Sequence, residues 1–220
     1  IELRLIANFS GDENMIDDYL SGKDIHTATA SKIFNIPHEM VKPNERRVAK
    51  SVNFGIVYGI SAYGLAQNIG ISPKEAGEFI KRYKEIYPRI EEYGQANIQQ
   101  AREKGYSETM FGRIRHINDI NSANHTMRSF AERTALNTPL QGSASDIIKI
   151  AMNKVHERLK NENLNSKLII QIHDELVVDC YPGASEKVKQ ILKQEMEKVV
   201  NLKVPLIVEV SEGKTLFDAK

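Results

Sequence analysis

The chain has 220 residues, a formal net charge of +1 and a single cysteine. This length can bury the core of one large domain or two small ones, and the composition is typical of a globular protein. Cys180 alone excludes an intrachain disulfide and is typical of a reducing compartment, so we expect a cytoplasmic protein. Because the net charge is close to zero, a nucleic-acid-binding function has to rest on local clusters of charge.

The first residues, IELRLIANFS, do not include an initiator methionine. They form an apolar-rich run that could be the end of a strand or the start of a helix. We interpret the chain as a piece of a longer protein that begins inside a secondary-structure element. A processed natural N-terminus is the alternative.

Residues that favour helix ends divide the first half of the chain into helices. The predicted starts are Asp24, Asn44, Ser72 and Pro88, with Pro73 and Glu75 completing a capping box after Ser72, and the predicted stop is Gly105. Around Gly112, the stretch YSETMFGRIRHI alternates and predicts a short hairpin.

The second half combines helices and strands. A long helical pattern is interrupted at Pro139, after which a second helix is predicted. KLIIQIHDELVVDC predicts a buried hairpin with an acidic tip at residues 173–175, and a helix over residues 185–200 and a strand PLIVEV follow. This order predicts an α+β fold, in which a mostly helical subdomain is inserted into a base with a small antiparallel sheet.

The stretch RRVAKSVNFGIVYG repeats a cation or an aromatic ring every four residues, at Arg46, Lys50, Phe54 and Tyr58. These side chains share one broad face of a helix, and valines and isoleucines share the opposite face. Two cations one turn apart can bind a chain of phosphates, and a ring one turn further can stack on a base or sugar. The spacing fits equally well a solvated basic stripe whose rings pack against a neighbouring helix.

Two other patterns have polar side chains that could be functional. Asp174 and Glu175 at the predicted hairpin tip could hold Mg²⁺, although aspartate is also a common turn residue. Arg133, Asn137 and Gln141 are again four residues apart, and they could contact a nucleic acid or form internal hydrogen bonds.

Together these motifs resemble the C-terminal part of a family A DNA polymerase, the bacterial DNA polymerase I type. RRVAKSVNFGIVYG resembles the motif Arg-x₃-Lys-x₃-Phe-x₃-Tyr-Gly of the family's fingers helix, and QIHDELV resembles the third palm motif. IELR resembles the tail of the first palm motif, and ERTALNTPLQGSASDIIK resembles the segment that contacts template and primer. The match covers essentially the whole chain in the family's order.

The resemblance implies a fingers and palm fragment, with palm at 1–22, fingers at 23–126 and palm again at 127–220. It implies template-directed transfer of deoxynucleotides to a primer 3′-hydroxyl by a two-metal mechanism. The implied partners are primer-template DNA and deoxynucleoside triphosphates, and the implied cofactor is Mg²⁺, for which Mn²⁺ could substitute. The complete enzyme would be a monomer.

By the same resemblance, Arg46 and Lys50 would contact the phosphates of the incoming nucleotide, and Lys50 would also be catalytic by protonating the pyrophosphate. Phe54 would lie against the sugar and base, and Tyr58 would lie at the insertion site near the templating base. Phenylalanine at position 54 is similar to family members that discriminate against dideoxynucleotides.

The resemblance also assigns roles outside this helix. Glu2 would help to reject a 2′-hydroxyl, and His26 would approach the triphosphate. Asp174 would be a metal ligand, with Glu175 supporting it as a second catalytic carboxylate. The residues that would contact primer or template are Arg133, Asn137, Gln141 and His173.

One departure from the family pattern concerns the metal site. The aspartate of the first palm motif would stand four residues before Ile1, outside this chain. We therefore expect the 220-residue piece not to polymerise DNA by itself. Two alternatives remain: a non-catalytic module whose cations hold DNA phosphates, and an RNA polymerase of the single-subunit phage type, which Glu2 disfavours.

Overall fold

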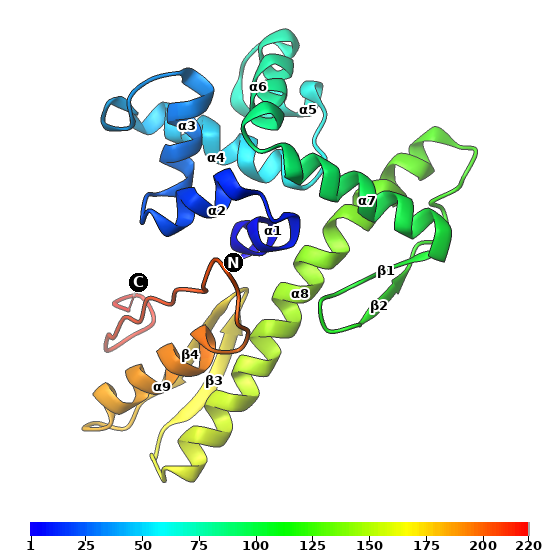
Figure 1. Cartoon of the computed structure of the whole chain (residues 1–220). Coiled ribbons are helices and arrows are strands. Elements are labelled where there is room, and N and C mark those ends of the chain that lie inside the picture. Colours follow the sequence, from blue (N-terminus) through cyan, green and yellow to red (C-terminus); the bar gives the residue numbers. More distant parts are fainter. Residues whose placement is uncertain (220) are drawn as a thin grey trace. The chain divides into compact units, whose positions relative to one another are not determined.

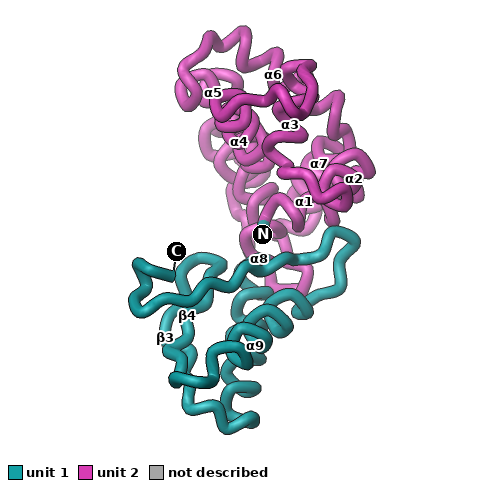
Figure 2. Tube along the Cα trace, turned by 90° about the vertical axis from the view of Figure 1, so that its left-hand side faces the viewer, with its two compact units in different colours: residues 1, 144–220 teal, residues 2–143 magenta. Residues whose placement is uncertain are grey.

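The computed structural model describes residues 1–219, which form two compact units. One unit spans residues 2–143, and the other combines residue 1 with residues from 144 onward (Figure 2). The described part contains nine α-helices and two two-stranded antiparallel sheets (Figure 1). The predicted α+β class, mostly helical with small antiparallel sheets, is confirmed.

The larger unit is a set of helices with one hairpin. The helices are α1 (Glu2–Ser10), α2 (Glu13–Leu20), α3 (Ile25–Phe34), a 3-10 turn (His38–Met40), α4 (Pro43–Val57), α5 (Ala62–Ile69), α6 (Pro73–Ile86), α7 (Pro88–Lys104) and the first part of α8 (His125–Asn161). The hairpin pairs β1 (Tyr106–Glu108) with β2 (Ile114–His116), as predicted around Gly112. Of the two alternatives for the first residues, the end of a strand or the start of a helix, the structure shows the helix α1.

Most of the predicted helix ends are confirmed. Asp24 accepts a hydrogen bond from the Thr27 amide, and Ser72 accepts one from the Glu75 amide, as N-caps do. The predicted N-cap Asn44 is wrong, since α4 begins at Pro43 and its N-cap is Lys42. Proline favours the first helical position because its φ is fixed and it needs no N–H partner there.

The predicted interruption at Pro139 is also wrong, because α8 continues through it. Because a proline has no N–H, the carbonyl four residues earlier lacks its helical donor. In α8 this is the carbonyl of Ala135. The buried hydroxyl of Ser107 donates to that carbonyl at 3.3 Å. A residue of β1 thus supplies the hydrogen bond that the proline removes, and the helix stays intact.

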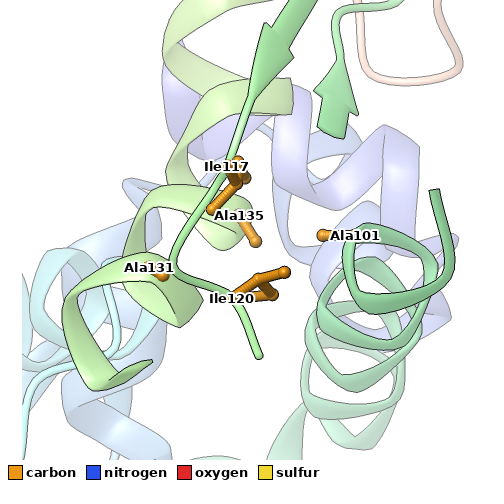
Figure 3. Close-up of a cluster of buried hydrophobic side chains, with 5 residues drawn as sticks. All are labelled: Ala101, Ile117, Ile120, Ala131 and Ala135. Atoms are coloured by element: carbon orange, nitrogen blue, oxygen red, sulfur yellow. The ribbon is translucent and has the colours of Figure 1, made fainter. Parts of the chain in front are cut away.

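Small side chains hold the hairpin region against the two long helices. Ala101 on α7 and Ala131 and Ala135 on α8 form a buried cluster with Ile117 and Ile120, which follow β2 (Figure 3). Alanines allow the helices to approach closely, and the isoleucines of the connecting loop fill the space between them.

Two helical glycines of this unit form a matched pair for a stability test. A Cβ at Gly142 would lie 2.5 Å from Cγ2 of Thr109, whereas a Cβ at Gly77 would find its nearest neighbour, Ala62, at 4.0 Å. Gly142→Ala is expected to lower the free energy of unfolding by about 1–3 kcal/mol through overpacking. Gly77→Ala is expected to raise it by about 0.4–1 kcal/mol, because alanine favours the helix. Thermal denaturation followed by circular dichroism measures both, and a stabilised Gly142→Ala would contradict this packing.

The smaller unit packs a hairpin and a helix on the second part of α8. Its elements are β3 (Lys167–Ile172), β4 (Glu175–Asp179) and α9 (Ser185–Glu197). The core of this unit is formed by Val155, Leu159, Val188, Ile191 and Leu192. The hairpin and the helix were both predicted, although α9 ends three residues earlier than expected.

Two predictions for this unit are wrong. The hairpin is less buried than expected, with Ile169 55% and Ile170 44% exposed. Residues 205–210 form no strand, and the Val208 amide donates to the Glu197 carboxylate at 3.0 Å instead of to a strand partner. The apolar alternation of this segment therefore serves packing, with Val204 and Leu206 buried.

The predicted division into palm (1–22), fingers (23–126) and palm (127–220) stays a prediction. The two compact units divide near residue 143. Within residues 1–219, no helix is both long enough and apolar enough to cross a membrane.

Candidate nucleotide-binding site

The two opposite faces of α4 differ in burial, as the spacing of their residues predicts. Val48, Ala49 and Val52 are buried, whereas Arg46 and Lys50 are exposed. The apolar side anchors the helix, and the cationic side faces outward. Tyr58 lies just past the last helical residue, as the C-cap of α4.

An open pocket of about 640 Å³ lies along the outward side of α4. Lys50, Phe54 and Tyr58 line it, together with Arg133 from α8 and Asn68 from α5. Arg47 and Lys50 give the pocket positive charge on α4, and Arg133 adds charge from α8. Such a pocket suits an anionic ligand with a flat ring.

Three rings stand in a row at this surface. The centroids of His26 and Phe54 are 5.8 Å apart, and those of Phe54 and Tyr58 are 6.3 Å apart, with the latter two rings stacked at 23°. A planar group of a ligand can bind to such a row by offset stacking on one of its rings. The aromatic part of the predicted face is therefore continuous, and it includes His26 from α3.

Arg46 does not line the pocket but forms a two-pronged ion pair with Asp24. Its Nε and Nη2 each donate to the Asp24 carboxylate at 2.9 Å. Burial acts to raise the pKa of Asp24, but the hydrogen bonds from Arg46 and Thr27 outweigh it and hold that pKa well below its usual range. The carboxylate is thus ionised near neutral pH, and it holds Arg46 near His26.

Three predicted site residues from distant parts of the chain meet at Tyr58. The Tyr58 hydroxyl donates to the Glu2 carboxylate of α1, and a hydrogen bond also links Tyr58 to Gln141 of α8. Burial raises the pKa of Tyr58 above its ordinary value, and the bond to Glu2 raises it further. The phenol therefore stays protonated and acts as a donor to Glu2.

Glycines make the sharp end of α4 possible. Gly59 has a φ of +72°, and a Cβ there would lie 3.2 Å from Leu136 and 3.3 Å from Arg133. A Cβ at Gly55 would lie 2.7 Å from the Ile60 side chain. The glycines thus allow the close approach of α8 and of the chain that follows the helix.

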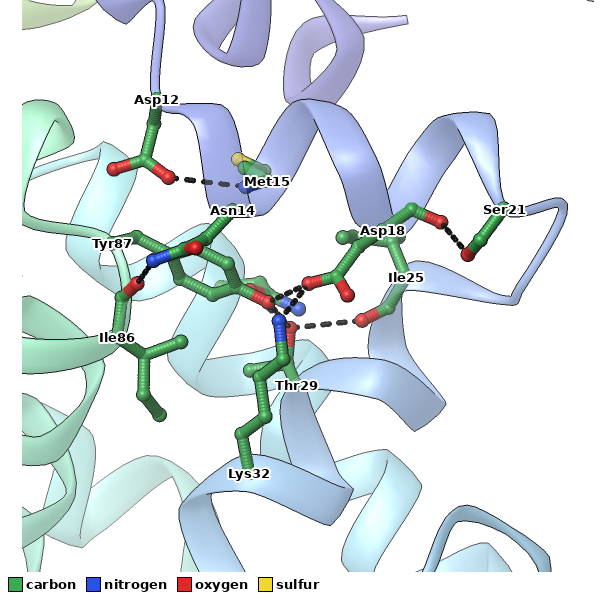
Figure 4. A network of polar contacts seen from close by, with 11 residues as sticks. Asp12, Asn14, Met15, Asp18, Ser21, Ile25, Thr29, Lys32, Ile86 and Tyr87 are labelled. Atoms are coloured by element: carbon green, nitrogen blue, oxygen red, sulfur yellow. Dashed lines mark hydrogen bonds and ion pairs between the residues drawn. The ribbon is translucent and has the colours of Figure 1, made fainter.

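Behind the ring row lies a buried polar network that the sequence patterns did not predict. Asp18 of α2 forms an ion pair with Lys32 and accepts a hydrogen bond from the Tyr87 hydroxyl at 2.7 Å (Figure 4). The Tyr87 hydroxyl lies 3.3 Å from that of Thr29, which lies 3.2 Å from Oδ1 of Asn53 on α4. Asn53 is the polar exception on the buried side of α4, and this is the signal that could have identified it.

The predicted acidic tip belongs to the other unit, at the turn between β3 and β4. His173 has a left-handed φ of 54°, which places Asp174 in the turn and Glu175 at the first position of β4. The Asp174 side chain is 57% exposed, and one of its oxygens lies 3.7 Å from the Ile1 amino group. An exposed carboxylate on a tight hairpin fits a hard divalent cation as one ligand. Among residues 1–219, no three His, Cys, Asp or Glu side chains gather in a group that could hold a metal ion.

The polar residues Arg133, Asn137 and Gln141 of α8 lie in two different environments. Arg133 lines the pocket, and Gln141 contacts Tyr58, so both lie at the predicted site. The Asn137 side chain has a buried oxygen, for which the described residues provide no hydrogen-bond partner.

These observations define a class of protein: a mostly helical α+β domain with a cationic, aromatic pocket that suits an anionic ligand with a flat ring. The model of DNA polymerase family A matches residues 1–218, and the chain belongs to this family.

The curated relatives are considerably longer than this chain. DNA polymerase I of Caldicellulosiruptor bescii is 50% identical over 220 residues, which are 100% of this chain and 26% of that protein. DNA polymerase I of Geobacillus stearothermophilus is 49% identical over 220 residues, again 100% of this chain and 25% of the relative. The chain thus spans about a quarter of the length of these relatives.

A solved structure has the same fold. It is the POL domain of Pol1 from M. smegmatis in complex with DNA primer-template and dNTP, with a TM-score of 0.96 and 38% identity. The similarity covers 100% of this chain and 39% of that one.

Proposed function

We propose that this chain forms the fingers and palm parts of a DNA-directed DNA polymerase. In this role it takes part in adding a deoxynucleotide, chosen by a template, to a primer 3′-hydroxyl with release of pyrophosphate. The observation that carries the proposal is the pocket on α4, where Lys50, Phe54 and Tyr58 lie beside Arg133. Two comparisons support the proposal. The chain belongs to family A, and it has the fold of the M. smegmatis POL domain, whose structure is a complex with DNA primer-template and dNTP.

We propose that separate side chains of the pocket bind separate parts of a nucleotide. Lys50 is exposed at the pocket and can neutralise phosphate oxygens, and Arg46 lies one turn before it. The row of Phe54 and Tyr58 offers stacking surfaces for the sugar and base. We propose that Lys50 also donates the proton to the leaving pyrophosphate.

We propose that Glu2 packs against the sugar and that Tyr58 lies at the insertion site near the templating base. Their mutual hydrogen bond holds both side chains in place. We propose that Glu2 thereby excludes a 2′-hydroxyl, so that the enzyme prefers deoxynucleotides. Arg133, Asn137 and Gln141 on α8 and His173 on the hairpin are proposed to contact primer or template.

The proposed cofactor is Mg²⁺, or Mn²⁺ in its place. Asp174 would hold the metal as one ligand, and Glu175 would support it from the start of β4. The chemistry that such an ion supplies when bound is Lewis-acid neutralisation of phosphate charge. We further propose that the complete enzyme is a cytoplasmic monomer.

Nucleotide binding by the chain itself tests the pocket. Lys50→Ala is expected to weaken the binding of a radiolabelled deoxynucleoside triphosphate about 10- to 100-fold, because it removes a charge-assisted contact to phosphate. Equilibrium dialysis in the presence of Mg²⁺ measures this change. Lys81→Ala is the control, since Lys81 lies on α6 with a side chain that is 79% exposed and pairs only loosely with Glu85 at 3.9 Å. Equal affinities of the two variants would contradict the proposal.

A further inference from the structure

His26 is held from behind by a side chain of the fingers helix. Nδ2 of Asn53 lies 3.1 Å from Nδ1 of His26, and Asn53 is fully buried. On its other side the His26 ring contacts Phe54, with centroids 5.8 Å apart. The imidazole is therefore held by two neighbouring residues of α4, and one of its nitrogens is occupied by Asn53.

The Asn53 amide lies between His26 and Thr29, with Oδ1 3.2 Å from the Thr29 hydroxyl. The single proton of that hydroxyl is also within reach of the Ile25 carbonyl at 2.8 Å and of the Tyr87 oxygen at 3.3 Å, whose own proton goes to Asp18. With the amide oxygen toward Thr29, the amide N–H₂ points to His26.

We propose that Asn53 is a positioning residue that selects the tautomer of His26 by donating to Nδ1, which leaves the imidazole proton on Nε2. A neutral imidazole carries one N–H, and the nitrogen that accepts a hydrogen bond cannot be the protonated one. The Nε2–H is then a fixed donor. This inference rests on the proposed function in one respect, namely that the donor serves an oxygen of the nucleotide triphosphate.

The charges around His26 favour the neutral ring. Burial lowers the pKa of His26, Asp24 opposes that effect, and the neighbouring Arg46 and Lys50 lower it further. Near neutral pH the residue therefore provides a hydrogen bond and leaves the neutralisation of phosphate to the two cations. The direction of its single N–H becomes the property that matters, and Asn53 determines it.

Nitrogen NMR of the free chain tests the tautomer without any nucleotide. In the ¹⁵N-histidine-labelled chain above the His26 pKa, the long-range ¹H–¹⁵N spectrum is expected to show His26 with its proton on Nε2, and His26→Gln identifies its signals. Asn53→Asp replaces the donor by an acceptor and is expected to move the proton to Nδ1. Asn53→Leu is nearly isosteric, removes the donor, and is expected to give a mixture of tautomers. A wild-type His26 protonated on Nδ1, or a tautomer unchanged in both variants, would overturn the proposal.

Nucleotide affinity then separates this proposal from the proposed function. Asn53→Leu is expected to weaken triphosphate binding about 5-fold, the size of one neutral hydrogen bond, and to have no further effect in a chain that carries His26→Ala. Equal weakening in both backgrounds would overturn a role that acts through His26. If the NMR result holds while wild-type chain binds no nucleotide, the selection of the tautomer stands and the proposed function fails.

Discussion

Replacing Asp174 by asparagine is expected to reduce primer extension at least about 100-fold, because the variant keeps the shape of the hairpin tip but loses the charge that a divalent cation requires. The substitution is best made in a chimera in which residues 1–220 replace the matching quarter of Geobacillus stearothermophilus DNA polymerase I. Extension of a labelled primer on gels measures the rate, and fluorescence anisotropy measures the affinity for primer-template. DNA affinity is expected to stay within about 3-fold, since one exposed carboxylate contributes little to it.

A neighbouring aspartate provides the control for this experiment. Asp179 lies at the far end of β4 and is exposed, so Asp179→Asn makes the same chemical change on the same hairpin. It is expected to leave extension unchanged. Near-normal extension by Asp174→Asn would show that the metal assignment is wrong.

Replacing Asp12 by alanine is expected to lower the free energy of unfolding by about 2–4 kcal/mol, since it removes an N-cap and leaves buried N–H groups without partners. Asp12 is 1% exposed. One of its oxygens accepts from the Met15 amide at 3.0 Å, the N-cap bond of α2 (Figure 4). The other accepts from the Arg89 amide at 3.1 Å, at the start of α7. One carboxylate thus closes two helix ends that are distant in the sequence.

Two further variants sharpen the test of Asp12. Asp12→Asn keeps one accepting oxygen and is expected to fall between the wild type and Asp12→Ala. Glu13→Ala removes the next carboxylate, whose side chain is 82% exposed, and is expected to change stability by less than about 0.5 kcal/mol. Urea denaturation followed by circular dichroism gives all three values. An Asp12→Ala variant as stable as Glu13→Ala would contradict the shared cap.

Local sequence signals predicted the elements that local chemistry determines. Asp24 and Ser72 accept the hydrogen bonds that their positions before a helix suggest, and the spacing of Lys50, Phe54 and Tyr58 places all three in one pocket. The order of the predicted helices and strands indicated the fold class, and the motifs indicated the membership of family A. The roles of the individual site residues stay predictions, as does the inactivity of the isolated 220-residue chain.

Several features that the local patterns missed depend on a partner far away in the sequence. Pro139 does not interrupt α8 because Ser107, from another element, satisfies the carbonyl that the proline leaves open. The spacing of the cations could not show that Arg46 is paired with Asp24, 22 residues earlier. The spacing did not single out Asn53, whose partners His26 and Thr29 lie on another helix.

Templated incorporation of a single nucleotide by the chimera tests the central claim most directly. A stable chimera is mixed with Mg²⁺, a primer-template and one deoxynucleoside triphosphate at a time. The primer is expected to grow by one residue only with the complementary deoxynucleotide, and Lys50→Ala is expected to raise strongly the nucleotide concentration required. A folded chimera that binds primer-template but incorporates no nucleotide, or incorporates all four regardless of the template, would contradict it.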